Sequence, residues 1–201
     1  MKRILVSYAT MSGSTAEVAQ AVGEEIVGGG LQVDVLPLEK VTDLTAYNAV
    51  VLGAPMIMGW HRSALTFLKK NRKTFEHISL AVFATAMSLT SAGESAVKGV
   101  PVCVDPILAK PAQNPQHLTL RENYASITRY ASPILHAADA NKPVSIAFFG
   151  GRLDYIRLKP LARLFVMFVI KAQPGDRRNW QAIRSWASSL YPLFNPRNAG
   201  N

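Results

Sequence analysis

The sequence predicts a doubly wound α/β fold, in which helices cover both faces of a central parallel sheet. Short apolar segments alternate along the chain with longer segments whose apolar residues lie three or four apart, the pattern of strands separated by helices. The inner segments, such as residues 49–52, are continuously apolar, as parallel strands covered on both faces are. A chain of 201 residues can bury a full core, so we expect residues 1–201 to form one domain.

The strands differ in how much of each is expected to be covered. Residues 31–36 alternate apolar and polar side chains, which indicates an edge strand that is exposed on one face. The other expected strands are nearly continuous in apolar residues and fit the inside of the sheet: residues 3–7, 49–52, 80–84 and 144–149.

The helices are expected from their periodic apolar faces. In residues 14–27, Val18, Val22 and Ile26 lie four apart, and the three glycines of residues 28–30 end the helix. The remaining helical segments are expected at about residues 62–72, 121–136, 158–171 and 178–190.

The segment from about residue 85 to residue 120 does not fit this alternation. It follows the fourth strand, has no clear periodicity, and contains Pro101, Pro106, Pro111 and Pro115. Such long connections within compact domains are usually functional or irregular. We expect this insertion to be either a flap that covers a substrate or a structural excursion.

Composition and charge narrow the classes of function. Lys and Arg number 22 against 13 Asp and Glu, and the resulting net charge of +9 attracts anions. A single cysteine, Cys103, excludes an internal disulfide and fits a reducing compartment. The four histidines have no metal-ligand spacing, and no basic and aromatic platform marks a nucleic-acid module, so neither a metal nor a nucleic-acid partner is expected.

The apolar runs are too short for a signal-peptide core or a membrane span. The run after Arg3 has three residues, and the longest one, residues 164–170, is far below the roughly 20 residues that cross a bilayer. We therefore expect a cytoplasmic protein, with at most a peripheral contact on the inner face of the cell membrane.

A loop rich in hydroxyl groups joins the first strand to the first helix. The N–H groups at a helix N-terminus lack intrahelical acceptors and carry the positive end of the helix dipole, so they suit a phosphate. A glycine allows close approach, and four hydroxyls add hydrogen-bond donors. An ordinary N-cap is the alternative. The loop consists of Thr10, Met11, Ser12, Gly13, Ser14 and Thr15.

The residues of this loop exclude two other classes of phosphate-binding protein. It has no G-x-x-x-x-G-K-[ST] motif, so it is not a P-loop, and no G-x-G-x-x-G motif, so a dinucleotide-binding Rossmann domain is not expected.

The loop resembles the phosphate loop of the flavodoxin family, [ST]-x-[ST]-G-x-T, at every specified position. Residues 53–60, Gly-Ala-Pro-Met-Ile-Met-Gly-Trp, are similar to the flavodoxin loop that packs on the flavin ring, and residues 85–89 supply a third loop. The resemblance implies a flavodoxin-like doubly wound sheet of five parallel strands, order 2-1-3-4-5, with a long insertion after strand 4. It also implies that these loops bind FMN.

Beyond the phosphate loop, the resemblance assigns the flavin to two further sets of residues. Flavodoxins usually carry an aromatic residue in the second loop, and here Met58 or Trp60 would contact the ring, unless Trp60 is a core aromatic. The residues assigned by the resemblance are Pro55, Met56, Ile57, Met58, Gly59, Trp60, Thr85, Ala86, Met87, Ser88 and Leu89.

Nearly the whole chain, except residues 92–117, resembles one subfamily, the bacterial menaquinone-dependent protoporphyrinogen IX dehydrogenases (oxidases). The similar positions are His61, Ser63, Ala64, Phe67, Lys69 and Lys70, then residues 150–155, 175–176 and 179–180. The resemblance implies an enzyme of heme biosynthesis that oxidises protoporphyrinogen IX and passes the electrons to a quinone. Acidic electron carriers fit less well, because a charge of +9 favours an anionic reduced flavin and two-electron chemistry.

A basic segment near the C-terminus supplies the expected substrate contacts. Arg152 and Arg157 would pair with propionates, and Asp154 with Tyr155 would handle protons, the alternative being surface charges, hydrogen bonds and structural ion pairs. Residues 152–191 combine basic and apolar side chains, which fits either a helix on an anionic lipid surface or a core helix with a solvated basic face.

The sequence leaves two other functions open. One is an NAD(P)H:quinone or flavin reductase, and the other is a non-enzymatic electron carrier of the flavodoxin type. No side chain is assigned as a catalytic residue, because the flavin would carry the chemistry.

Overall fold

The central sheet has the strand order that the sequence predicts, with two additional strands at one edge. The structure is a computed structural model that describes residues 3–57, 59–153 and 175–194. Its main sheet has the order β2-β1-β3-β4-β9-β7-β6, so the five expected strands occur as 2-1-3-4-5 and all pair in parallel. Those five strands are β1 (Arg3–Tyr8), β2 (Gln32–Pro37), β3 (Ala49–Pro55), β4 (Ser79–Ala86) and β9 (Ser145–Gly150).

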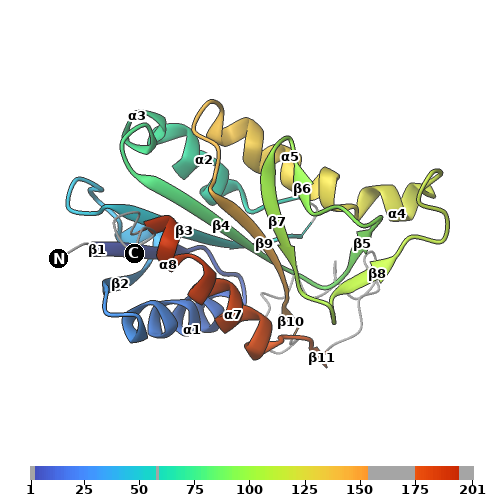
Figure 1. Cartoon of the computed structure of the whole chain (residues 1–201), viewed down its shortest axis with the longest axis horizontal. Coiled ribbons are helices and arrows are strands. Elements are labelled where there is room, and N and C mark those ends of the chain that lie inside the picture. Colours follow the sequence, from blue (N-terminus) through green and yellow to red (C-terminus); the bar gives the residue numbers. More distant parts are fainter. Residues whose placement is uncertain (1–2, 58, 154–174, 195–201) are drawn as a thin grey trace.

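Helices cover both faces of this sheet (Figure 1). One face carries α1 (Ser14–Gly28), α7 (Trp180–Ser189) and α8 (Tyr191–Phe194). The other face carries α2 (Arg62–Lys70), α3 (Arg72–Phe75) and α5 (Ile127–Ala138). None of the helices built from described residues has the length and apolar character needed to cross a membrane.

The strands between these layers divide the core into two clusters. Along β1, Ile4 and Val6 pack on the α1 face and Leu5 packs on the α5 face, all fully buried. This alternation follows from the two-residue period of strands, and it explains why the inner strands are apolar throughout. On the α1 face, the rings of Phe83 and Phe149 lie 6.2 and 5.6 Å from the ring of Trp186, which anchors α7.

The insertion forms strands, so the prediction of five strands was incomplete. Its β7 (Val100–Val104) pairs in parallel with β9, and β6 (Ala96–Val97) pairs antiparallel with β7. Pro101 interrupts a short valine-rich segment, which concealed the strand from a reading based on periodicity. Two further strands, β5 (Leu89–Ser91) and β8 (Ala109–Pro111), form a separate parallel pair. The described insertion is thus largely an extension of the sheet.

Other boundaries differ by a turn. The helix expected at 121–136 is two helices, α4 (Leu120–Tyr124) and α5, because the Ser126 hydroxyl accepts the Arg129 N–H and starts a new helix. The helix expected at 62–72 ends at Lys70, and α3 follows. A 3₁₀ turn, η1 (Leu38–Lys40), follows β2.

The last expected helix starts two residues later than predicted, at Trp180 of α7. Before it, β10 (Arg152–Leu153) pairs antiparallel with β11 (Gly175–Asp176). The helix predicted at 158–171 lies outside the described residues.

Candidate functional site

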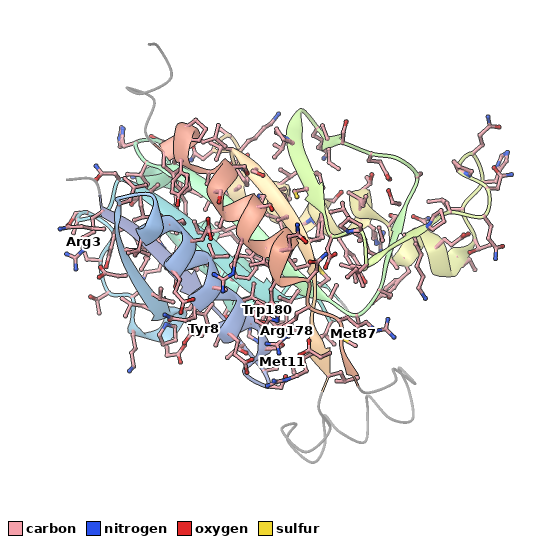
Figure 2. All side chains as sticks on the ribbon, turned by 60° about the horizontal axis from the view of Figure 1, so that its bottom comes forward. Arg3, Tyr8, Met11, Met87, Arg178 and Trp180 are labelled. Atoms are coloured by element: carbon pink, nitrogen blue, oxygen red, sulfur yellow. The ribbon has the colours of Figure 1, made fainter. Side chains whose placement is uncertain are left out.

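Three loops of the predicted site meet at the carboxyl ends of neighbouring strands β1, β3 and β4. In Figure 2, Met11 and Met87 lie at the same end of the molecule as Arg178 and Trp180, away from Arg3 at the start of β1. Ligands of open α/β sheets bind at this edge, near the point where the strand order reverses.

The first loop leaves the N-terminus of α1 open. Gly13 is the N-cap residue, with a φ of 89°, a left-handed conformation that only glycine adopts without strain. Its N–H donates to the Thr10 hydroxyl at 2.9 Å, so the loop is closed on itself. No described side chain caps the helix. The alternative of an ordinary side-chain N-cap therefore does not describe this loop, and no side chain of the described residues takes the capping position that a phosphate would occupy.

Thr85, at the end of β4, connects all three loops. Its hydroxyl lies 2.9 Å from the hydroxyl of Thr15, and both side chains are buried. Its carbonyl accepts the N–H of Met56, in the second loop, at 2.8 Å. Thr85 thus fixes the position of the first loop relative to the second.

The second loop is a tight turn, and Trp60, which follows it, is buried. Ile57 donates its N–H to the carbonyl of Gly59 at 3.0 Å, and Gly59 has a φ of 116°. Trp60 is only 2% exposed and belongs to the core, so the alternative of a core aromatic describes it. Its indole N–H is buried and has no acceptor among the described residues. Met58 lies outside the described residues, while Ile57 is 36% exposed.

The third loop is shorter than predicted. Thr85 and Ala86 belong to β4, because they pair with Phe149 and Gly150 of β9, and Leu89 is already the buried start of β5. Only Met87 and Ser88 lie between the strands. The Met87 carbonyl accepts a hydrogen bond from the Arg177 guanidinium at 2.7 Å.

An ion-pair cluster stands beside the phosphate loop. Glu17, in the first turn of α1, pairs with Arg152 at 2.8 Å and with Arg178, which also pairs with Asp176. Hydrogen bonding from Arg178 lowers the pKa of Asp176, and Asp176 in turn raises the pKa of Arg178. Arg178 is almost fully buried and stacks on Trp180, its guanidinium carbon 4.6 Å from the ring centroid.

The predicted substrate contacts are only partly described. Arg152 has Glu17 as its ion-pair partner, and its side chain is 22% exposed. The other predicted contacts, Asp154, Tyr155 and Arg157, lie outside the described residues.

Asp105 was missed by the sequence reasoning, although it follows the apolar segment that forms β7. Its carboxyl group is fully buried. It accepts the N–H of Ile107 at 3.0 Å, the N–H of Gly150 at 3.3 Å and the side-chain amide of Asn179 at 3.1 Å. A side chain at Gly150 would collide with the Arg177 carbonyl, 1.8 Å from the position of its Cβ. The insertion, β9 and the start of α7 are therefore tightly joined behind the site.

The geometry defines a class of α/β protein in which three loops, the first of them rich in hydroxyl groups and without Lys or Arg, meet at the switch point of the sheet. Residues 5–179 match the model of a flavodoxin domain. The chain therefore belongs to the flavodoxin domain family. A search of curated protein sequences gave no match.

Two solved structures support the fold. A two-electron-reduced flavodoxin of Megasphaera elsdenii matches 92% of this chain and 98% of its own, with a TM-score of 0.51 and 9% identity. Rubredoxin oxygen:oxidoreductase from Desulfovibrio gigas matches all of this chain but 38% of its own, with a TM-score of 0.52 and 11% identity. The match to a short-chain flavodoxin associated with a bacterial microcompartment spans 62% of that protein and 43% of this one, at a TM-score of 0.39 and 22% identity.

Proposed function

We propose that this protein is an FMN-dependent oxidoreductase that binds its cofactor at the carboxyl edge of the sheet. FMN is the cofactor of its family. The observation that carries the proposal is the open N-terminus of α1, which Thr85 joins to the other two loops. The donors present fit a phosphate ester: N–H groups of a helix N-terminus and the hydroxyls of Thr10 and Ser12, with no Lys or Arg in the loop.

Different loops would hold different parts of the cofactor. The loop from Thr10 to Thr15 would hold the phosphate, while Ile57 and Met87, from the second and third loops, would border the ring. Bound FMN supplies hydride and electron transfer, and the protein positions it and tunes its surroundings. Arg178, Asp176, Glu17 and Arg152 pair among themselves, so this cluster fixes β11 against α1.

For the reaction, we propose oxidation of a reduced organic substrate, protoporphyrinogen IX, with a quinone as electron acceptor. The support is the resemblance of nearly the whole chain to that subfamily and the net charge of +9, which attracts the substrate's propionates. Contact with an anionic membrane surface would bring the enzyme to a lipid-dissolved quinone.

An anaerobic titration tests this reaction. Protoporphyrinogen IX should bleach the flavin absorbance of the holoprotein, and a menaquinone analogue should restore it at least as fast as the enzyme turns over. If NAD(P)H alone bleaches the flavin, a reductase is the better description. Loss of both responses in a protein that retains FMN would refute the proposed reaction.

A second candidate is a non-enzymatic electron carrier. It is favoured by the similarity in fold to the flavodoxin of Megasphaera elsdenii. Rapid electron exchange with a partner redox protein, without turnover of protoporphyrinogen or quinone, would support this candidate.

A further inference from the structure

A cavity of about 340 Å³ adjoins the second loop on the α5 face of the sheet. One wall comes from Gly59, in the loop that would border the flavin ring, and the others come from α4 and α5. The cavity volume lies at the lower end of the range for small-molecule sites, about 300–1,000 Å³. Its lining residues are Gly59, Tyr124, Arg129, Tyr130, Ser132 and Pro133.

Two aromatic rings give this cavity flat apolar walls. Tyr130 packs against Phe148 of β9, with ring centroids 6.2 Å apart, so its ring is held in place by the core. Tyr124, the last residue of α4, is 49% exposed and completes the wall from outside. Aromatic side chains favour planar ligands, which pack on them by offset or edge-to-face contacts.

Arg129 gives the cavity a positive charge. It occupies the first turn of α5, where the Ser126 hydroxyl accepts its N–H at 3.2 Å and fixes the start of the helix. In the described parts of the chain, no carboxyl group forms an ion pair with Arg129, whereas Arg3, Arg72, Arg152, Arg178 and Arg184 all have such partners. A guanidinium that lacks an acidic partner suits a carboxylate, which it can bind through two parallel hydrogen bonds.

Pro133 adds a polar group to the same helix segment. Because proline has no N–H, the carbonyl of Arg129, four residues earlier, loses its usual helical donor. Both residues line the cavity. The segment thus combines an interrupted helical hydrogen bond, a guanidinium and the ring of Tyr130 within about one turn of α5.

We propose that this cavity binds a planar aromatic ring that bears a carboxylate, either alone or as one ring of a larger substrate that would exchange electrons with the flavin beside Gly59. The ligand is a bicyclic aromatic acid or the carboxylate-bearing edge of a larger ring, with Arg129 on its carboxylate and Tyr124 and Tyr130 on its faces. Its role in electron exchange rests on the proposed function, whereas binding itself does not.

The test uses two probes that differ only in charge, 2-naphthoate and 2-naphthamide, titrated into the FMN-loaded protein by isothermal calorimetry. The wild type should bind the naphthoate at least tenfold more tightly than the naphthamide. Arg129→Gln should remove this preference. Arg184→Gln, on the opposite face of the sheet, changes the net charge equally and should keep it. Ser132→Phe, which fills the cavity, should weaken both probes at least tenfold.

Each outcome has one meaning. An unchanged preference in Arg129→Gln, or unchanged binding in Ser132→Phe, would overturn the cavity proposal even if the protein is yellow with FMN. A protein that binds no FMN would refute the proposed function, and the same titrations on the apoprotein would still decide the cavity. Flavin absorbance measured on every variant separates the two failures.

Discussion

At the scale of single residues, Thr85 determines how the site is assembled. It ends β4, yet its hydroxyl contacts Thr15 of α1 and its carbonyl accepts the N–H of Met56. Because Thr15 and Thr85 are both buried, the hydrogen bond between their hydroxyls has no water to replace either partner.

Replacing either threonine by valine keeps the shape but leaves the other hydroxyl unpaired. Thr15→Val and Thr85→Val should each lower the free energy of unfolding of the apoprotein by about 1–3 kcal/mol, and the double variant should lose less than the sum. Urea denaturation measures all four proteins. Strictly additive losses would show that the two hydroxyls do not depend on each other.

Asp176 provides a residue-scale prediction for pH. The Arg178 hydrogen bond lowers its pKa, so its contribution to stability is present above the usual value near 4 and is lost as the pH falls through the lowered value. At pH 7, Asp176→Asn should be less stable than wild type by up to about 1 kcal/mol, because the side chain is nearly half exposed to water.

This difference should shrink as the pH falls below 4. Thermal unfolding of both proteins from pH 7 to pH 3 measures it, and a difference that stays constant over this range would rule out the ion pair as its source.

At the scale of elements, Asp105 joins the insertion to the rest of the fold. Its three donors come from the loop after β7, the end of β9 and the residue before α7. The chain segments that they connect are far apart in sequence, so the carboxyl group links the insertion to β9 and to the start of α7.

Asp105→Ala should therefore lower the free energy of unfolding by about 3 kcal/mol, since it leaves buried donors without an acceptor. Asp43→Ala is the matched control, because Asp43 is exposed and accepts hydrogen bonds from Leu44 and Thr45, the next two residues in the chain. Denaturant unfolding of both variants checks the comparison. Equal stability of the two variants would contradict the structural role assigned to Asp105.

At the scale of the whole molecule, the sequence was sufficient for the five-strand frame, and the phosphate-binding role of the first loop stays a prediction. The inner strands could be predicted because both of their faces are buried, which makes them continuously apolar. Their order, 2-1-3-4-5, followed from the family resemblance. Strand β7 was hidden by Pro101, and the break before α5 depends on one capping serine, Ser126.

The parts of the site that escaped prediction depend on contacts distant in sequence. Thr85 was placed in a loop, but its role comes from partners 70 and 29 residues away. Trp60 sits next to a glycine turn in sequence, and only its burial in the cluster that also holds residues of α2 and α5 shows that it belongs to the core. Arg152 carries a charge that local sequence cannot pair with Glu17, since 135 residues separate them.

The central claim is that uncharged donors at the N-terminus of α1 hold the phosphate of FMN. The most direct test is a titration of the apoprotein with FMN in which the quenching of flavin fluorescence measures binding. The wild type should bind one FMN, and Gly13→Val should bind it at least tenfold more weakly, because valine strains a φ of 89° and so disturbs the loop. Gly30→Val places the same strain at a φ of 82° away from the loop and should keep wild-type affinity. Equal affinity in Gly13→Val and wild type, or no binding by the wild type, would contradict the account.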